Sequence, residues 1–330
     1  MACAWPTAPR PGRWHFLAAV AALCLTTVDS FGEAQKYLIV SAPRVSKIAY
    51  LKLPSTGAPA TGGTPMRTLI SKGLKFPQGV AVDQFRKRLF VADPNLGFLA
   101  GYNIFHERDA LAVGKVWTVA QNVEVRSVGV DGLGNVFFTD EPRQLILRVT
   151  ARDIEQGRVA PEIIYDSSYQ PQVSAPGGIA VDNYFIYWLN KANGERVGTI
   201  VRAPHEPALA ANSSADSGLG VVSLASNAMK CYGVCLALGH LFYTDETYNL
   251  YGLPRAATAR HNPVTISSAL VEPRGCAFDG DGTVYVADKD QNAIYQFASN
   301  MERLGSDRQL TKAADLEGAF GVAVYVRVVS

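Results

Sequence analysis

The stretch Pro273-Arg-Gly-Cys-Ala-Phe-Asp-Gly-Asp-Gly-Thr-Val-Tyr-Val-Ala-Asp288 decides the fold of this chain. It joins two short apolar runs through a turn of Gly and Asp residues, and a third run follows from Ala293 to Phe297. Short apolar runs separated by such turn residues are typical of antiparallel strands joined as hairpins. The sequence therefore predicts a sheet built from consecutive strands.

The first strand of this unit recurs along the chain at a nearly constant spacing. Successive copies start 48, 51, 55, 42 and 46 residues apart. Each of the first five is followed by a second apolar run that ends in a polar residue, and then by a third run and a weaker fourth. Four strands in a repeat of this length are the size of a propeller blade. The six copies begin at Gly79, Ser127, Gly178, Gly233, Gly275 and Gly321.

The two ends of the chain settle the number of blades. After Gly321 there is room for one strand only, whereas Tyr37 to Ser41, Lys47 to Leu53 and Thr68 to Ile70 match the second, third and fourth strands of a unit. The last strand should therefore complete the first blade, because such closure leaves no open sheet edges between the two ends. We predict an all-β, six-bladed propeller with four-stranded blades.

The repeats resemble two related families of six-bladed propellers. Pro273 to Asp288, continued by Asn292-Ala-Ile-Tyr-Gln-Phe297, resembles a unit of the NHL repeat proteins. Leu241-Phe-Tyr-Thr-Asp245 and Ile186-Tyr-Trp-Leu-Asn190 are more similar to the YWTD propellers of the low-density-lipoprotein receptor class. The resemblance covers residues 37 to 330 and implies a single propeller domain, residues 31–330. It does not imply one function, because both families include enzymes and binding proteins.

Residues 1–30 have the pattern of a secretory signal peptide. Arg10 and Arg13 precede an uncharged apolar run from Phe16 to Val28, and cleavage is expected after Ser30. The run of about 13 residues is shorter than the roughly 20 of a spanning helix, and an uncleaved anchor is the alternative. No later segment is apolar for long enough to cross a bilayer. Asn212-Ser-Ser214 is a glycosylation sequon, so we expect a secreted or lumenal glycoprotein.

Composition excludes several classes of protein. The chain has 330 residues, 48% of them hydrophobic, and a formal net charge of +2. This is too apolar for a disordered chain and not basic enough to predict nucleic-acid binding.

Three cysteines follow the signal peptide, namely Cys231, Cys235 and Cys276. Cys231 and Cys235 are about 13 Å apart in an extended strand, too far for a disulfide. We expect buried free thiols, with a bridge to Cys276 as the alternative.

The acids that end the first and second strands recur in almost every unit. Carboxylates of this kind accept hydrogen bonds from nearby backbone N–H groups and set turns. Repetition itself favours this structural role, because a catalytic acid is needed only once. The acids are Asp83, Asp131, Asp182 and Asp279 after the first strands, and Asp93, Asp140, Asp245 and Asp288 after the second.

The residues that precede the six first strands should surround one end of the axial channel. They form a polar and aromatic ring with two arginines and no carboxylate, and they are our candidate binding residues. Arg126 and Arg274 belong to opposite blades, so both could contact one anionic group. The ring consists of Gln78, Arg126, Gly177, Tyr232, Arg274 and Phe320.

Enzymatic relatives of this fold use other residues at that end. The gluconolactonase-like hydrolases hold a divalent cation with Glu, Asn and Asp, which are absent in register here, although Glu124, Glu272 and Glu317 lie nearby. The amidating lyase uses His ligands for zinc, and no His enters a first strand here. We therefore predict no cofactor, with a divalent cation possible, and no catalytic residue.

These observations favour a non-catalytic interaction propeller that recognises a protein or glycan, possibly anionic, through the axial face. The alternative is a metal-dependent hydrolase, lactonase or lyase that acts in the axial channel.

Overall fold

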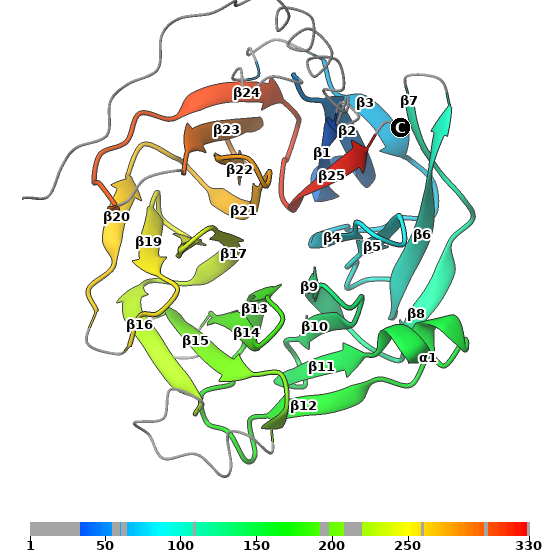
Figure 1. The fold of residues 1–330 in the computed structure, drawn as a ribbon, viewed down its shortest axis with the longest axis horizontal. Helices are drawn as coiled ribbons and strands as arrows, with labels where there is room; N and C mark the ends of the chain where they lie inside the picture. Colours follow the sequence, from blue (N-terminus) through cyan, green and yellow to red (C-terminus); the bar gives the residue numbers. More distant parts are fainter. Residues whose placement is uncertain are drawn as a thin grey trace, which may run out of the picture.

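The computed structural model describes residues 34–54, 60, 65–107, 110–191, 198–207, 220–258, 261–299 and 303–328. Its strands form six antiparallel sheets arranged around a central axis (Figure 1). The predicted six-bladed propeller is confirmed. The strand nearest the axis is the first strand of each repeat, as expected from the Gly, Ala and Val residues at these positions.

Blades 1 to 3 contain the strands from the two ends of the chain and from its first half, named here from the inner to the outer strand of each blade. Blade 1 consists of β25 (Val322–Val328), β1 (Ala34–Ala42), β2 (Lys47–Lys52) and β3 (Arg67–Ile70). Blade 2 consists of β4 (Val80–Asp83), β5 (Arg88–Val91) and β6 (Phe98–Glu107), with β7 (Ala110–Val113) and β8 (Trp117–Gln121) both paired to β6. Blade 3 consists of β9 (Val125–Val130), β10 (Val136–Asp140), β11 (Leu145–Val149) and β12 (Glu162–Asp166).

The other three blades have the same order. Blade 4 consists of β13 (Pro176–Val181), β14 (Phe185–Asn190), β15 (Gly198–Pro204) and β16 (Val222–Ala228). Blade 5 consists of β17 (Cys231–Ala237), β18 (His240–Asp245), β19 (Leu250–Pro254) and β20 (Val264–Ser267). Blade 6 consists of β21 (Pro273–Phe278), β22 (Thr283–Asp288), β23 (Ala293–Ala298) and β24 (Thr311–Asp315).

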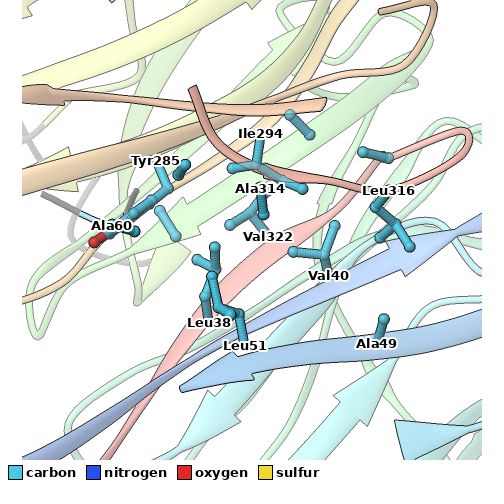
Figure 2. Close-up of a cluster of buried hydrophobic side chains, with 14 of the residues drawn as sticks. Leu38, Val40, Ala49, Leu51, Ala60, Tyr285, Ile294, Ala314, Leu316 and Val322 are labelled. Atoms are coloured by element: carbon cyan, nitrogen blue, oxygen red, sulfur yellow. The ribbon is translucent and has the colours of Figure 1, made fainter. Parts of the chain in front are cut away.

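The ring closes as predicted, through the C-terminal strand. β25 pairs with β1 in antiparallel register from Val322 opposite Val40 to Val328 opposite Ala34. A buried apolar cluster then packs blade 1 against blade 6 (Figure 2). In it, Leu38 and Val322 of blade 1 lie with Ile294 of blade 6. Closure therefore combines strand pairing with a shared core.

Some outer elements differ from the sequence prediction. The sequence predicts the fourth strands of blades 5 and 6 at Ser267 to Val271 and Arg308 to Thr311, whereas β20 ends at Ser267 and β24 starts at Thr311. β7 was not predicted, because it pairs with the long extension of β6 outside the four-strand repeat. The short helix α1 (Ala151–Glu155) was also missed; the Thr150 side chain caps it by accepting a hydrogen bond from the Asp153 N–H. Outer strands carry weaker patterns because one side faces solvent.

The structural role predicted for the repeated acids is confirmed. Asp288 accepts hydrogen bonds from the N–H groups of Val271, Glu272 and Gln291. Asp93 does the same for Lys75, Phe76 and Asn95. In these two blades the bonds tie the end of the second strand to the segment that enters the first strand, whereas Asp245 of blade 5 accepts from the N–H groups of its own turn, Thr247, Tyr248 and Asn249.

Hydroxyl groups join neighbouring blades at every second junction, where the inner strands begin. Thr139 accepts a hydrogen bond from the Ser127 N–H of its own blade (3.2 Å) and donates one to the Gly177 carbonyl of the next (2.7 Å). Ser41 and Thr244 occupy the same position in blades 1 and 5 and bond to the carbonyls of Gln78 and Arg274. At the junction of blades 6 and 1 the backbone bonds directly, Gly275 N–H to Phe320 carbonyl at 2.8 Å.

Glycine begins most inner strands because neighbouring strands approach closely there. A Cβ atom at Gly233 would lie 2.1 Å from the Arg274 carbonyl oxygen, and one at Gly321 would lie 2.1 Å from that of Gln78. No side chain can be accommodated at these positions without moving the backbone. The same crowding holds the six predicted ring residues close around one end of the axis.

Candidate functional site at the mouth of the axial channel

The inner strands enclose a cavity of about 440 Å³ along the axis. Its wall is mostly Val, Ala, Ile and Gly from β4, β9, β13, β17, β21 and β25. At the end where these strands begin, here called the mouth, the lining includes Gln78, Arg126, Gly177, Tyr232 and Phe320. The cavity is thus an apolar tube with a polar and aromatic entrance, a composition typical of small-molecule sites.

Arg274 is not available at the mouth as the sequence suggested. Its side chain is 5% exposed and forms an ion pair with Glu272, which also binds Lys289 at 2.7 Å. Its guanidinium lies over the Tyr232 ring, with the central carbon 3.8 Å from the ring centroid. Arg274 therefore has partners within the protein, and joint contact of Arg126 and Arg274 with one anion stays a prediction from the sequence. Tyr232 and Glu272 are both in contact with the Arg274 guanidinium, because a buried charge requires close partners.

Arg126 lines the cavity but also has carboxylate partners. It forms ion pairs with Glu124 at 2.6 Å and with Glu141 at 2.9 Å, and its side chain is 25% exposed. Glu141 in turn binds Nζ of Lys191 at 2.7 Å. The expectation that Glu124 and Glu272 lie close to the ring is confirmed, and both act there as partners of arginines.

Lys191 is the residue of this site that sequence reasoning missed. It lines the cavity, with Nζ 5.3 Å from the Tyr232 ring centroid. Burial lowers its pKa below the ordinary lysine value; Glu141 opposes this shift, while Arg126 and Arg274 add to it. Burial also raises the pKa of Tyr232 to about 12. Lys191 is therefore a partly desolvated ammonium group at the entrance of an apolar cavity.

The other predicted ring residues contribute shape and backbone contacts. Gln78 is buried, and its carbonyl is bonded to Ser41. Gly177 leaves room for the Lys191 side chain, whose Cε would lie 3.1 Å from a Cβ at this position. Phe320 lies beside Arg274, with its ring centroid 5.7 Å from the guanidinium carbon. The structure thus brings all six predicted residues together at the mouth.

A disulfide between Cys235 of β17 and Cys276 of β21 also lines the cavity. The two Cα atoms are 5.6 Å apart, within the usual range for a disulfide. The expectation of free thiols is wrong for this pair, since adjacent inner strands place the two residues side by side. Cys231 is free and buried. The bridge joins blades 5 and 6 beside the channel.

Within the described ranges, no group of three or more His, Cys, Asp or Glu residues is placed to hold a metal ion. Glu124, Glu141 and Glu272 are all engaged by cationic side chains. The predicted glycosylation site Asn212 and the signal peptide, residues 1–30, lie outside the described residues. No described helix is long and apolar enough to cross a membrane.

The chain matches no family model, and no curated protein is detectably similar to it in sequence. Solved structures of similar fold include a gluconolactonase from Xanthomonas campestris, with 13% identity over 85% of this chain and 88% of that one and a TM-score of 0.56. A luciferin-regenerating enzyme matches with 13% identity over 72% of this chain and 76% of that one, and a TM-score of 0.50. Virginiamycin B lyase from Staphylococcus aureus has 15% identity over 72% and 69%, and a TM-score of 0.47.

The matches to the gluconolactonase and the luciferin-regenerating enzyme agree with the propeller fold. They do not confirm the NHL or YWTD type, and at such low identity they carry no residue roles to this chain.

Proposed function

We propose that the axial channel binds a small organic anion with an apolar body. The observation that carries this proposal is a cavity of about 440 Å³ with apolar walls whose entrance presents the two cations Arg126 and Lys191. A carboxylate at the entrance would contact these groups while the rest of the ligand lies against Val and Ala side chains. Burying the apolar part contributes about 25 cal/mol per Å².

Lys191 supplies the specificity in this proposal. Its ion pair with Glu141 leaves other hydrogen-bonding directions of the ammonium group for a ligand. A charge-assisted hydrogen bond contributes about 1.5–3 kcal/mol. An anionic ligand should therefore bind at least tenfold more tightly than its neutral analogue.

Octanoate and octanol test this proposal, because they share an apolar chain and differ in charge. We expect calorimetry to show tighter binding of octanoate and a tenfold or greater loss of its affinity in Lys191→Met. Lys230→Met is the matched control, since Lys230 pairs with Glu246 and does not line the cavity. Equal binding of the two compounds, or an unchanged affinity in Lys191→Met, would contradict the proposal.

The pH dependence of octanoate binding adds a second readout. Lys191 is charged below its pKa, and burial has lowered that pKa from the ordinary value of 10.5. Affinity for octanoate should therefore fall as the pH rises through the lowered pKa, before an ordinary lysine loses its proton. Octanol binding should not change over the same range.

Catalysis in the channel is the second candidate function. Lys191 favours it, because a desolvated amine beside a carboxylate is suited to accept a proton. Hydrolysis of an aliphatic lactone that stops in Lys191→Met and survives chelation would indicate lysine-dependent catalysis. Loss of hydrolysis on chelation, restored by calcium or zinc, would instead indicate the metal-dependent alternative.

We also propose that the protein enters the secretory route. The Cys235–Cys276 disulfide supports this, because disulfides form and persist in oxidising compartments. A protein or glycan partner at the axial face stays a prediction from the sequence.

A further inference from the structure

A second pocket, of about 460 Å³, lies between blades 1 and 2 at the end of the propeller opposite the mouth. It is formed by the turn between β4 and β5 together with the end of β25 and His106 near the end of the long strand β6. Its lining includes Lys87, His106, Tyr325 and Arg327. We call this the basic pocket. Its lining shares Gln84 and Val326 with that of the axial cavity.

Within the described part of the chain, no carboxylate pairs with Lys87 or Arg327. The carboxylates beside the same turn, Asp83 and Glu155, are held by Arg86. Positive charge is therefore concentrated in the basic pocket without local neutralisation. Such a pocket favours an anion.

His106 adds an unsatisfied polar group. Its ring packs against Tyr37 and Tyr325, with centroid distances of 6.0 and 5.6 Å. Its Nε2 atom is buried and has no hydrogen-bond partner among the described residues. Burial, reinforced by Arg327 and Lys87, lowers the pKa of His106, so the ring is mostly neutral at pH 7 and one of its nitrogens can donate to an oxygen anion. An unpartnered buried nitrogen beside two cations suits a phosphate group.

The end of the molecule that carries the basic pocket also exposes large apolar side chains. Phe85, which lines the basic pocket, is 86% exposed, and Leu133 and Tyr184 lie at the corresponding turns of blades 3 and 4 with 67% and 76% exposure. These turns join first to second strands and therefore lie on one face, here called the turn face. Leu238 occupies the same turn of blade 5, and Val328 ends β25 on this face.

Aromatic and aliphatic side chains next to cations are the combination found at membrane interfaces. The path of the chain points to the same occupant. Ala34, the first residue of β1, pairs with Val328 at the turn face, so residues 1–33 join the propeller there. Those residues include the apolar run from Phe16 to Val28. If that run is retained as an anchor, the turn face is the side of the propeller next to the membrane.

We propose that the turn face docks on an anionic lipid bilayer. Lys87, His106 and Arg327 bind a lipid phosphate in the basic pocket, and Phe85, Leu133 and Tyr184 enter the interfacial layer. This inference is independent of the function proposed for the axial channel, because it uses none of the same residues.

Co-sedimentation with vesicles tests the docking. We expect the protein to bind vesicles of phosphatidylcholine mixed with phosphatidylserine and to bind pure phosphatidylcholine much less. Lys87→Gln should weaken binding to the mixed vesicles about fivefold, the effect expected for one basic residue at an anionic surface. The matched control is Lys72→Gln, which changes an exposed lysine that follows β3 at the mouth end.

The apolar contribution needs its own pair of variants. Phe85→Ser should weaken vesicle binding, whereas Tyr169→Ser should not, because Tyr169 is 88% exposed in the segment that leads into β13 at the mouth. Both substitutions are at exposed sites, and melting curves will confirm that the variants are folded.

Two results would overturn the proposal. One is equal binding to both vesicle types, or binding unaffected by Lys87→Gln and Phe85→Ser. The other is calorimetric binding of inorganic phosphate that is lost in Lys87→Gln while vesicles do not bind, which would make the basic pocket a site for a soluble anion.

Discussion

At the scale of single residues, Arg274 decides how the mouth is built. Its guanidinium lies over the ring of Tyr232 and near that of Phe320, and its charge is balanced by Glu272. A cation over an aromatic face contributes up to about 2 kcal/mol when both are desolvated. Arg126 has comparable ion pairs but is more exposed, and water reduces their contribution.

This difference predicts unequal effects of two similar substitutions. Arg274→Met should lower the free energy of unfolding by about 1–2 kcal/mol, because the aromatic contact is lost while Lys289 keeps Glu272 paired. Arg126→Met should have a smaller effect. Denaturant unfolding of both variants measures the difference, and equal destabilisation would contradict the stacking argument.

The sequence identified the six ring positions but not the contacts between their side chains. Glu141, Lys191, Glu246 and Lys289 each directly follow the polar residue that ends a second strand. Second strands run antiparallel to the first and therefore end at the mouth. The position of these four residues at the mouth could thus have been predicted from the repeat. Which of these side chains form ion pairs could not be predicted, because that depends on the distances between long side chains of neighbouring blades.

At the scale of the elements, the junctions between inner strands are held by buried hydrogen bonds. Thr139 is fully buried and satisfies both the Ser127 N–H and the Gly177 carbonyl. Ser41 of blade 1 and Thr244 of blade 5 have the same role. The other three blades have no hydroxyl group at the equivalent position, which is occupied by Ala92, Leu189 and Ala287. The propeller therefore has an approximate threefold pattern within its six blades.

Thr139→Val tests this role, because valine keeps the shape and removes the hydroxyl. The substitution leaves a buried N–H and a carbonyl without their partner, which costs about 1–3 kcal/mol. We expect a corresponding fall in the free energy of unfolding, measured with urea. Thr265→Val, in the outer strand β20, is the control and should be nearly neutral; an equal loss there would argue against the junction.

Strands near the axis were predicted well and outer strands less well, for a physical reason. Second strands are largely buried on both sides, so Phe and Tyr mark them clearly, as in β10 with all five residues buried, and the inner strands are marked by their repeated Gly, Val and Ala. Outer strands such as β24 have exposed polar residues at both ends and depend on their neighbour for register. The disulfide was missed because it joins two strands whose spacing only the closed ring defines.

At the scale of the whole molecule, closure depends on the last strand. β25 is the inner strand of blade 1, and its Tyr325 is almost fully buried beside Tyr37. It also contacts blade 2, where the Gln84 side chain donates to the Val324 carbonyl at 2.6 Å and accepts from the Val326 N–H at 2.9 Å. One strand at the C-terminus thus joins blades 1 and 2 as well as the two ends of the chain.

Deletion of residues 321–330 should therefore damage the protein far more than its length suggests. It removes the strand paired with β1, exposes the backbone edge of β1 and opens the apolar cluster between blades 1 and 6. Unpaired edges and exposed core favour aggregation. We expect the truncated protein to aggregate, as measured by size-exclusion chromatography and thermal melting. Deletion of residues 329 and 330 alone is the control, because β25 ends at Val328. A soluble protein that lacks residues 321–330 and still melts cooperatively would mean that β25 is not needed to close the ring.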